Sequence, residues 1–416
     1  MKIADGVYVH FIPTQKYKTN RIVFRMTGSL NKQTIAKRAL VSQMLATANQ
    51  TYPTVQSFKE RLASLYGTQL STRVSTKGLT HSVDIELTYL KDTFIPTNDG
   101  LFWEVLGFLK ECLYKPLSRV AQYQNRVFDI EKQNLKTYLD VDTENNYYYS
   151  EVKGRELYFV NEGLKVPKYG QAELVEAETS FTAYQEFQSM LTRDRIDIFM
   201  VGEFDDYQVL QALHRFPLEG RQVDLQFSYS QPYVNVVKEK IEPRQSSQSI
   251  LQLGYQFPCQ YGDKDYFALI VFNAMFGEFA HSALFTTLRE KEGLAYSISS
   301  QFDVFTGLLE VYAGIEKSNR NQAMRGISRE LNYIKLGRFS SSLLNQTKKI
   351  IRMNALLSED HALTLVEQRF NKVIFGDKSL SLENWLDEIE KVTKKDVCRV
   401  ARQVKLQSLF FLEGVS

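Results

Sequence analysis

The sequence predicts an α+β fold of two similar domains, each an antiparallel sheet with helices packed on it, joined by a linker. The length of 416 residues exceeds one ordinary hydrophobic core and suits two domains of roughly 200 residues each. The stretches "ERLASLYGTQLSTRVSTKGLTHSVDIEL" and "TTLREKEGLAYSISSQFDVFTGLLEVYAGI" both indicate helix, glycine, strand, glycine turn and strand, about 220 residues apart. A polar, proline-containing stretch, 218–247, separates the two copies and predicts the linker.

Composition narrows the class of protein further. Hydrophobic residues make up 44% of the chain and charged residues 24%, as in a soluble globular protein. The net charge of +3 gives no argument for nucleic-acid binding. The N-terminus lacks the apolar run of a signal peptide, and no window reaches the ~20 apolar residues of a membrane-spanning helix. Three widely spaced cysteines argue against a disulfide framework and a cysteine zinc site, so we expect a cytoplasmic protein.

The first predicted domain, residues 1–217, mixes strands and amphipathic helices. Thr54 is the expected N-cap of a helix that Gly67 ends. Val83, Ile85 and Leu87 alternate onto one face of a strand. Strands are expected in the runs "GVYVHFIP" and "NRIVFRMTG" and at Gln69–Lys77, Leu79–Leu90 and Arg195–Gly202, and helices at Ile35–Asn49, Thr54–Tyr66, Leu101–Tyr114, Tyr123–Asp140 and Tyr207–Phe216.

The second predicted domain, residues 248–416, repeats this order after the linker. Thr306 and Gly307 form the expected turn of a β-hairpin. The expected strands are Ile250–Gln256, Tyr296–Val304, Leu308–Gly314 and Ser408–Glu413, with a helix at Lys264–Phe276, another ending in "REKEG", and several helices after the hairpin.

Residue types for metal or acid–base catalysis are scarce. The five histidines are His10, His81, His214, His281 and His361. No two of them lie within five residues, so no H-x-x-E-H pair exists. His81 shares the parity of the buried strand face and is expected to be buried. No nucleophile-elbow, Walker or dinucleotide motif occurs, so residue chemistry alone offers nothing that could activate a water molecule.

One long stretch nevertheless resembles a known family. "FNAMFGEFAHSALFTTLREKEGLAYSISSQFDVFTGLLEVYAGI" is similar to the C-terminal domain of the pitrilysin/insulinase family of zinc peptidases, and it includes the L-R-E-K-x-G-L-A-Y core. "RALVSQMLATANQTYPTVQSFKERLASLYG" is similar to the first-domain helices of that family. The N-terminal "IPTQKYKTN", "RAL" and "YPT" resemble a bacterial subgroup of short chains that form pairs of unequal subunits. The resemblance covers nearly the whole chain and implies a metallopeptidase-like αβ roll.

The zinc motif of the family is missing. Active members carry H-x-x-E-H on a first-domain helix, and the resemblance places Ala39 and Gln43 at its two histidines and Ser42 at its general base. The third ligand, a glutamate, falls near Tyr138. Alanine and serine side chains cannot bind zinc or take a proton from water. We therefore expect this chain to bind no metal or other cofactor and not to hydrolyse peptides unaided.

The resemblance also implies a second set of functional residues. In the family, an arginine and a tyrosine seven residues apart hold the substrate backbone and the developing oxyanion, and Arg289 and Tyr296 match them. Both side chains are hydrogen-bond donors suited to a peptide carbonyl. His281 lies in a segment that borders the substrate chamber in the family, where it would tune access or cap the following helix. A surface ion pair for Arg289 and sheet packing for Tyr296 are the structural alternative.

Two functions follow from this pattern. The first is a zinc-free subunit of a heterodimeric peptidase, in which Arg289 and Tyr296 act in trans on the zinc site of a homologous H-x-x-E-H partner. The second is a catalytically inactive scaffold or peptide-binding protein, which needs no zinc-binding partner. A third reading, an independent metalloenzyme, is disfavoured by the spacing of the histidines. Peptide is the expected ligand, and neither nucleic acid nor membrane is an expected partner.

Overall fold

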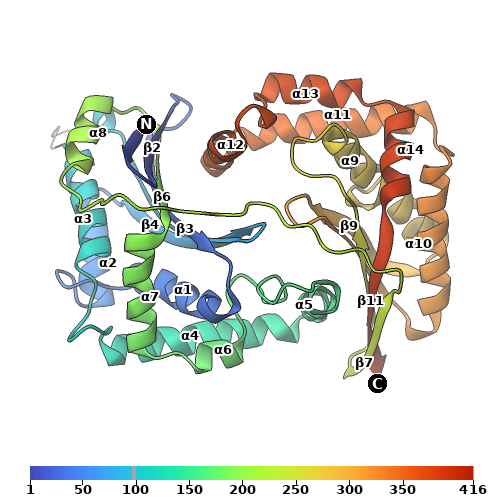
Figure 1. Ribbon diagram of the computed structural model, residues 1–416, viewed down its shortest axis with the longest axis horizontal. Coiled ribbons are helices and arrows are strands. Elements are labelled where there is room, and N and C mark those ends of the chain that lie inside the picture. The colour runs from blue at the N-terminus through green and yellow to red at the C-terminus, as the bar shows by residue number, and fades with distance from the viewer. Residues whose placement is uncertain (96–99, 416) are drawn as a thin grey trace. The chain divides into compact units, whose positions relative to one another are not determined.

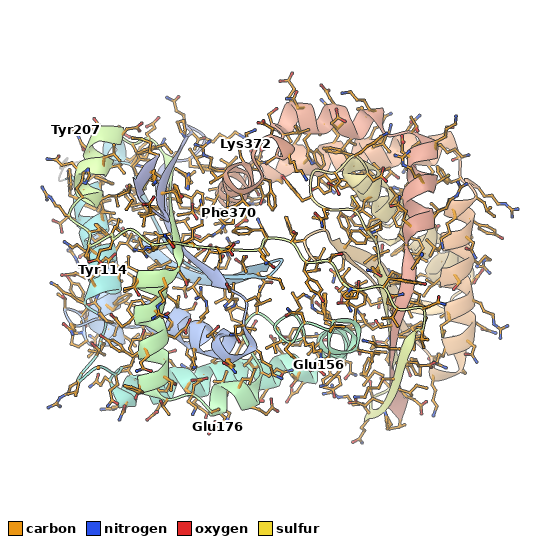
Figure 2. All side chains as sticks on the ribbon, in the orientation of Figure 1. Tyr114, Glu156, Glu176, Tyr207, Phe370 and Lys372 are labelled. Atoms are coloured by element: carbon orange, nitrogen blue, oxygen red, sulfur yellow. The ribbon has the colours of Figure 1, made fainter. Side chains whose placement is uncertain are left out.

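The structure, a computed structural model, describes residues 1–95 and 100–415 and divides into two compact units (Figure 1). The first unit comprises 1–141, 166–227 and 362–369, and the second comprises 142–165, 228–361 and 370–416. Each unit pairs one sheet with helices, so the predicted α+β class is confirmed. Side chains of the helices and of the sheet fill the interior of each unit (Figure 2).

A six-stranded sheet in the order β1-β2-β6-β3-β5-β4 forms the first unit. Its strands are β1 (Lys2–Ala4), β2 (Val7–Pro13), β3 (Thr19–Ser29), β4 (Gln69–Lys77), β5 (Thr80–Leu90) and β6 (Arg195–Gly202). All pairs are antiparallel except β2 with β6. Phe24 on the central strand β3 lies opposite Ile85 and Ile198, and all three side chains are fully buried. The alternation that predicted β5 therefore places the apolar residues in the core.

Helices pack on this sheet and complete the first core. They are α1 (Lys32–Leu45), α2 (Val55–Ser64), α3 (Leu101–Tyr114), α4 (Asn125–Glu144), α6 (Ala172–Glu176), α7 (Ser180–Arg193), α8 (Asp206–Leu213) and the first eight residues of α12 (Ala362–Phe375). Thr54 caps α2 as predicted, because its hydroxyl accepts a hydrogen bond from the Ser57 amide at 3.1 Å. Tyr207, labelled on α8 in Figure 2, is 75% exposed and marks the outer side of that helix.

The second unit is built on a five-stranded sheet in the order β7-β11-β8-β10-β9. Its strands are β7 (Lys238–Gln245), β8 (Ser249–Gln256), β9 (Ala295–Asp303), β10 (Leu308–Ile315) and β11 (Lys405–Val415). The predicted hairpin forms β9 and β10. The only departure from antiparallel pairing among these described strands is β7 with β11, so each sheet is mixed rather than purely antiparallel. Strand β7 occupies part of the stretch expected to be a linker.

The two faces of this sheet differ in character. Leu251, Leu253 and Phe411 belong to the main core of the unit. The alternate positions Ile250 and Phe410 pack instead against tyrosines of α5 (Asn146–Tyr158). The helices of the unit are α5, α9 (Tyr266–Asn273), α10 (Arg320–Lys335), α11 (Ser341–Ser358), α13 (Leu382–Lys391), α14 (Lys394–Gln403), the remainder of α12, and π-helical turns at Ala274–Glu278 and Phe285–Lys291.

The compact units interleave along the chain, whereas the predicted domains 1–217 and 248–416 are continuous in sequence. Helix α5 is not among the helices expected from the sequence. It comes from the first half of the chain and packs on β8 and β11 of the second unit. Among residues 1–95 and 100–415, no helix combines the length and the apolar character needed to cross a membrane.

Candidate functional site

Helix α1 carries the positions that the resemblance assigns to the zinc motif. Asn31 begins the helix, since its side chain accepts a hydrogen bond from the Gln33 amide at 2.9 Å. Ala39 and Ser42 are buried, and Gln43 is half-buried. A methyl group and a hydroxyl in a packed interior supply neither a zinc ligand nor a base. These residues do not fit the metal that the family implies.

The position expected for a third ligand is equally unsuited. Tyr138 lies on α4 with its side chain 51% exposed, and its ring packs edge-on against Tyr169 at 5.9 Å between centroids. Within residues 1–95 and 100–415, no group of three His, Cys, Asp or Glu side chains could hold a metal ion. The donor set on α1 and α4 therefore gives no route to a metal-bound water.

A buried ion pair holds α1 beside the positions that the resemblance assigns to the zinc motif. Arg38, one residue before Ala39, donates to the Asp194 carboxylate at 2.6 Å and to the His81 carbonyl at 2.8 Å. Burial alone would lower the pKa of the Arg38 guanidinium, but Asp194 and Glu186 raise it, so the side chain stays charged. A Cβ at Gly28 would lie 2.5 Å from the Asp194 carboxylate, so only glycine admits this pair.

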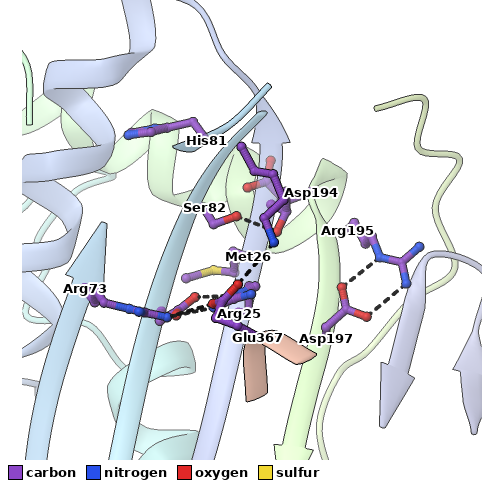
Figure 3. A network of polar contacts seen from close by, with 12 residues as sticks. Arg25, Met26, Arg73, His81, Ser82, Asp194, Arg195, Asp197 and Glu367 are labelled. Atoms are coloured by element: carbon purple, nitrogen blue, oxygen red, sulfur yellow. Dashed lines mark hydrogen bonds and ion pairs between the residues drawn. The ribbon is translucent and has the colours of Figure 1, made fainter. Parts of the chain in front are cut away.

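A second network of charges lies on strands β3, β4 and β5 of the first unit (Figure 3). Arg25 binds Asp84 through two hydrogen bonds of 2.8 Å and Glu367 at 2.5 Å. Arg73 reaches the same two carboxylates at 2.9 and 3.1 Å. Burial would raise the pKa of Glu367, but Arg25, Lys77 and Arg73 outweigh it and lower the pKa to about 2. The network fixes the start of α12 to this sheet.

His81 and His10 make structural contacts within the first unit. His81 is fully buried, as predicted, and burial together with Arg38 lowers its pKa to about 3. Its Nε2 atom lies 2.9 Å from the Lys168 carbonyl. His10 lies 2.7 Å from the Asp197 carboxylate, which Arg195 also binds (Figure 3). The Nε2 atom of each ring therefore has a partner within the first unit.

Arg289 and Tyr296 lie at the junction of a π-helical turn and strand β9. Gly293 adopts a φ of +60° and ends the helix, so the chain can turn into the strand. Arg289 is exposed and its guanidinium lies 4.6 Å from the centroid of the Phe285 ring. In the part of the chain that the structure describes, it has no carboxylate partner. Tyr296 is 56% exposed and donates its hydroxyl proton to Glu316.

His281 precedes this turn in the second unit. Its Nε2 atom lies 2.8 Å from the Thr347 hydroxyl of α11. Burial lowers the pKa of the ring, so its neutral form is favoured. The helix start is capped by Ser282, whose hydroxyl accepts from the Phe285 amide at 3.4 Å and whose carbonyl accepts from Thr286. His281 thus anchors to α11 rather than capping the helix.

The fold and the site define a metallopeptidase-like chain of two α+β units in which α1 has no metal-ligating side chain at the expected positions. The family model described as "Peptidase M16 inactive domain" matches residues 184–351. "Probable inactive metalloprotease YmfF" of Bacillus subtilis (strain 168) is 30% identical over 410 residues, which are 98% of this chain and 96% of that protein. The chain belongs to the M16 family, the pitrilysin/insulinase peptidases.

Solved structures share this fold over nearly the whole chain. A conserved protein from Enterococcus faecalis V583 superposes with a TM-score of 0.97 at 36% identity, over 100% of this chain and 98% of the other. A protease from Helicobacter pylori has a TM-score of 0.78 at 14% identity, over 98% and 97% of the two chains. The second likeness is one of fold alone.

Proposed function

We propose that this chain is the non-zinc-binding subunit of a heterodimeric zinc metallopeptidase. The observation that carries the proposal is the combination on α1 of an intact helix with Ala39, Ser42 and Gln43 in place of the zinc ligands and the base. Hydrolysis then requires a partner, a homologous chain that carries H-x-x-E-H and the zinc. This chain contributes substrate and oxyanion contacts.

Arg289 and Tyr296 are the residues that make those contacts in this proposal. A guanidinium and a phenol both donate hydrogen bonds to a peptide carbonyl. These hydrogen bonds strengthen as the carbonyl oxygen gains charge in the transition state. Exposure of both side chains supports this role. The phenol has a single proton, which it donates to Glu316 when no peptide is bound, so in this proposal the peptide carbonyl replaces Glu316 as the acceptor. One such donor contributes on the order of 3 kcal/mol to catalysis.

Mixing the two purified subunits with an internally quenched peptide tests the proposal. The pair should cleave the peptide faster than the partner alone, and Arg289→Ala or Tyr296→Phe should lower kcat by about 100-fold without blocking assembly. Arg352→Ala and Tyr333→Phe are matched controls on exposed helix positions of the same unit, and they should leave kcat unchanged. No gain in activity over the partner alone would overturn the proposal.

A catalytically inactive scaffold or peptide-binding protein is the second candidate. The buried Arg38–Asp194 pair beside Ala39 favours it, because α1 is stabilised without any metal. In this case, the isolated chain binds peptide, and pull-downs recover no zinc-dependent partner. A cytoplasmic location is proposed for either function, since Cys112, Cys259 and Cys398 are all free thiols.

A further inference from the structure

A cavity of about 410 Å³ lies on the polar face of the second unit's sheet, beside helix α5. Three aromatic rings line it, those of Tyr147, Tyr148 and Tyr312. Its polar wall includes Glu151 on α5, Gln252 on β8 and Gln301 on β9. All of these residues belong to one compact unit, so the cavity is complete within it.

Strand register explains why this face is polar. Tyr312 lies opposite Gln252 on one side and Ser299 on the other. Two residues along β10, Glu310 lies opposite Gln301. The intervening residue Val311 faces the apolar core. Because side chains of a strand alternate between faces, the polar side chains all lie on the α5 side of the sheet.

Two glycines set the approach of α5 to this face. A Cβ at Gly154 of α5 would lie 2.6 Å from the Cγ atom of Gln252. A Cβ at Gly314 of β10 would overlap the hydroxyl of Tyr147. Tyr147 is further fixed by the Ser297 hydroxyl at 2.6 Å and by Gln248 at 3.1 Å. The aromatic wall is therefore held in place by packing and hydrogen bonds.

The cavity has an excess of negative charge. Glu151 is the one charged residue that lines it, and among residues 1–95 and 100–415 its carboxylate has no hydrogen-bond or ion-pair partner. Just behind the wall, the buried Glu310 accepts hydrogen bonds from Gln252 at 3.4 Å and Gln301 at 3.3 Å. Arg155, 3.7 Å from Glu310, is the only cation paired with these two carboxylates in the described chain.

The electrostatics of Glu310 agree with this excess. Burial, with smaller contributions from Glu151 and Asp303, raises its pKa to about 7, although Arg155 and the hydrogen bond from Gln301 act in the opposite direction. An added positive charge in the cavity would therefore be attracted both by the half-buried carboxylate of Glu151 and by the buried one of Glu310. Aromatic rings favour the same charge, since a cation near a ring face interacts with the negative side of the quadrupole.

We propose that this cavity binds the basic side chain of a peptide, an arginine guanidinium or a lysine ammonium group. Glu151 supplies the charge-assisted hydrogen bond, and Tyr147, Tyr148 and Tyr312 enclose the alkyl stem and the cation. The choice of a peptide as the source of the cation rests on the proposed function. The cavity itself belongs to this chain alone, so its binding needs neither the partner nor zinc.

Calorimetric titration of the full chain tests the proposal. The probe is an acetylated, amidated pentapeptide of alanine with a central arginine, and its match has citrulline there, which has the same size but no charge. The arginine peptide should bind at least tenfold more tightly. Glu151→Gln should remove that preference, and Tyr312→Leu should weaken the arginine peptide several-fold. Glu383→Gln, an exposed carboxylate on α13, is the matched control and should leave both affinities unchanged.

Thermal unfolding separates a binding defect from a folding defect, because a variant with an unchanged melting temperature has kept the fold. Equal affinity for the two peptides, or an arginine preference that survives in Glu151→Gln, would overturn the proposal. Since no hydrolysis is measured, failure of the heterodimeric peptidase would not affect this result. Conversely, if wild type binds the two peptides equally but shows normal partner-dependent cleavage, only the proposal for the cavity is rejected.

Discussion

The guanidinium of Arg38 lies 2.6 Å from the carboxylate of Asp194, which is 156 residues further along the chain. Arg38 sits on α1 directly before Ala39, and both members of the pair are buried. The pair joins the helix to the end of α7, where Asp194 follows the last helical residue. A charge pair within the protein therefore holds the helix that carries Ala39, Ser42 and Gln43.

Removal of Arg38 should destabilise the first unit strongly. Arg38→Ala leaves the Asp194 carboxylate buried without its cation, and loss of one partner of a buried pair costs about 3–5 kcal/mol. Urea unfolding followed by circular dichroism gives the free energy of unfolding. Lys37→Ala, at a half-buried position on the same helix, is the control and should change it by less than about 0.5 kcal/mol. A similar loss of unfolding free energy in both variants would show that the buried pair contributes no more to stability than Lys37 does.

Zinc binding offers a test of the positions assigned to the lost ligands. The triple variant Ala39→His, Ser42→Glu and Gln43→His supplies two ligands and a base, whereas catalytic zinc sites use three protein ligands. Adding Tyr138→Glu should therefore raise zinc affinity by at least tenfold, measured by competition with a chelating dye. The control adds Glu131→Gln to the triple variant instead. Equal affinity of the triple and quadruple variants would mean that Tyr138 does not occupy the third-ligand position.

Much of the fold could be predicted from local pattern. The bounds expected for Gln69–Lys77, Leu101–Tyr114 and Arg195–Gly202 match β4, α3 and β6. Leu70 and Val74 lie on one face of β4, whereas α3 and β6 are apolar runs of helical and strand length. Thr54 caps its helix through a local hydrogen bond that the spacing to Ser57 already indicates. These features depend on near neighbours in the sequence.

Features that depend on distant contacts could not be predicted in the same way. Strand β7 is polar and contains Pro243, which is typical of a linker, yet it pairs with β11 at the edge of the sheet, where proline is tolerated. Helix α5 contains Gly154 because Gln252 of strand β8 packs against that position. In the sequence, a glycine at this point argues against a helix. Likewise, nothing near Arg38 in the sequence identifies Asp194 as its partner.

Acid should weaken the network around Glu367 through a shift in its ionisation. The pKa of Glu367 falls from its ordinary value near 4.5 to about 2, so its contribution to stability is complete above pH 4.5 and is lost as the pH falls toward 2. Glu367→Gln should lower the free energy of unfolding at pH 7 by about 1 kcal/mol, a modest figure because a third of the side chain is exposed to screening solvent.

The measurement is urea unfolding of wild type and Glu367→Gln at pH 7, 4 and 3. The difference between the two proteins should shrink as the pH falls. Glu173→Gln, an exposed carboxylate on α6, should show no such trend. A difference that is constant with pH would mean that the carboxylate acts by packing and not by its charge.

Glu310 should produce the opposite dependence on pH. Its pKa is raised from near 4.5 to about 7, chiefly by burial, so the folded state holds a proton that the unfolded chain has released. The free energy of unfolding therefore falls as the pH rises from about 4.5 to about 7, by at most on the order of 3 kcal/mol. Glu310→Gln removes the ionisation. The urea midpoint of this variant minus that of wild type should therefore be larger at pH 8 than at pH 5.

Parallel urea titrations of wild type and Glu310→Gln at the two pH values check this sign. Glu383→Gln is the control, because an exposed carboxylate pays no desolvation cost in the folded state. If Glu310→Gln and wild type differ equally at pH 5 and pH 8, the buried carboxyl does not titrate in this range. If Glu310 is ionised at pH 8, addition of the arginine pentapeptide at that pH should stabilise wild type more than Glu310→Gln, since a bound cation offsets the charge that burial disfavours.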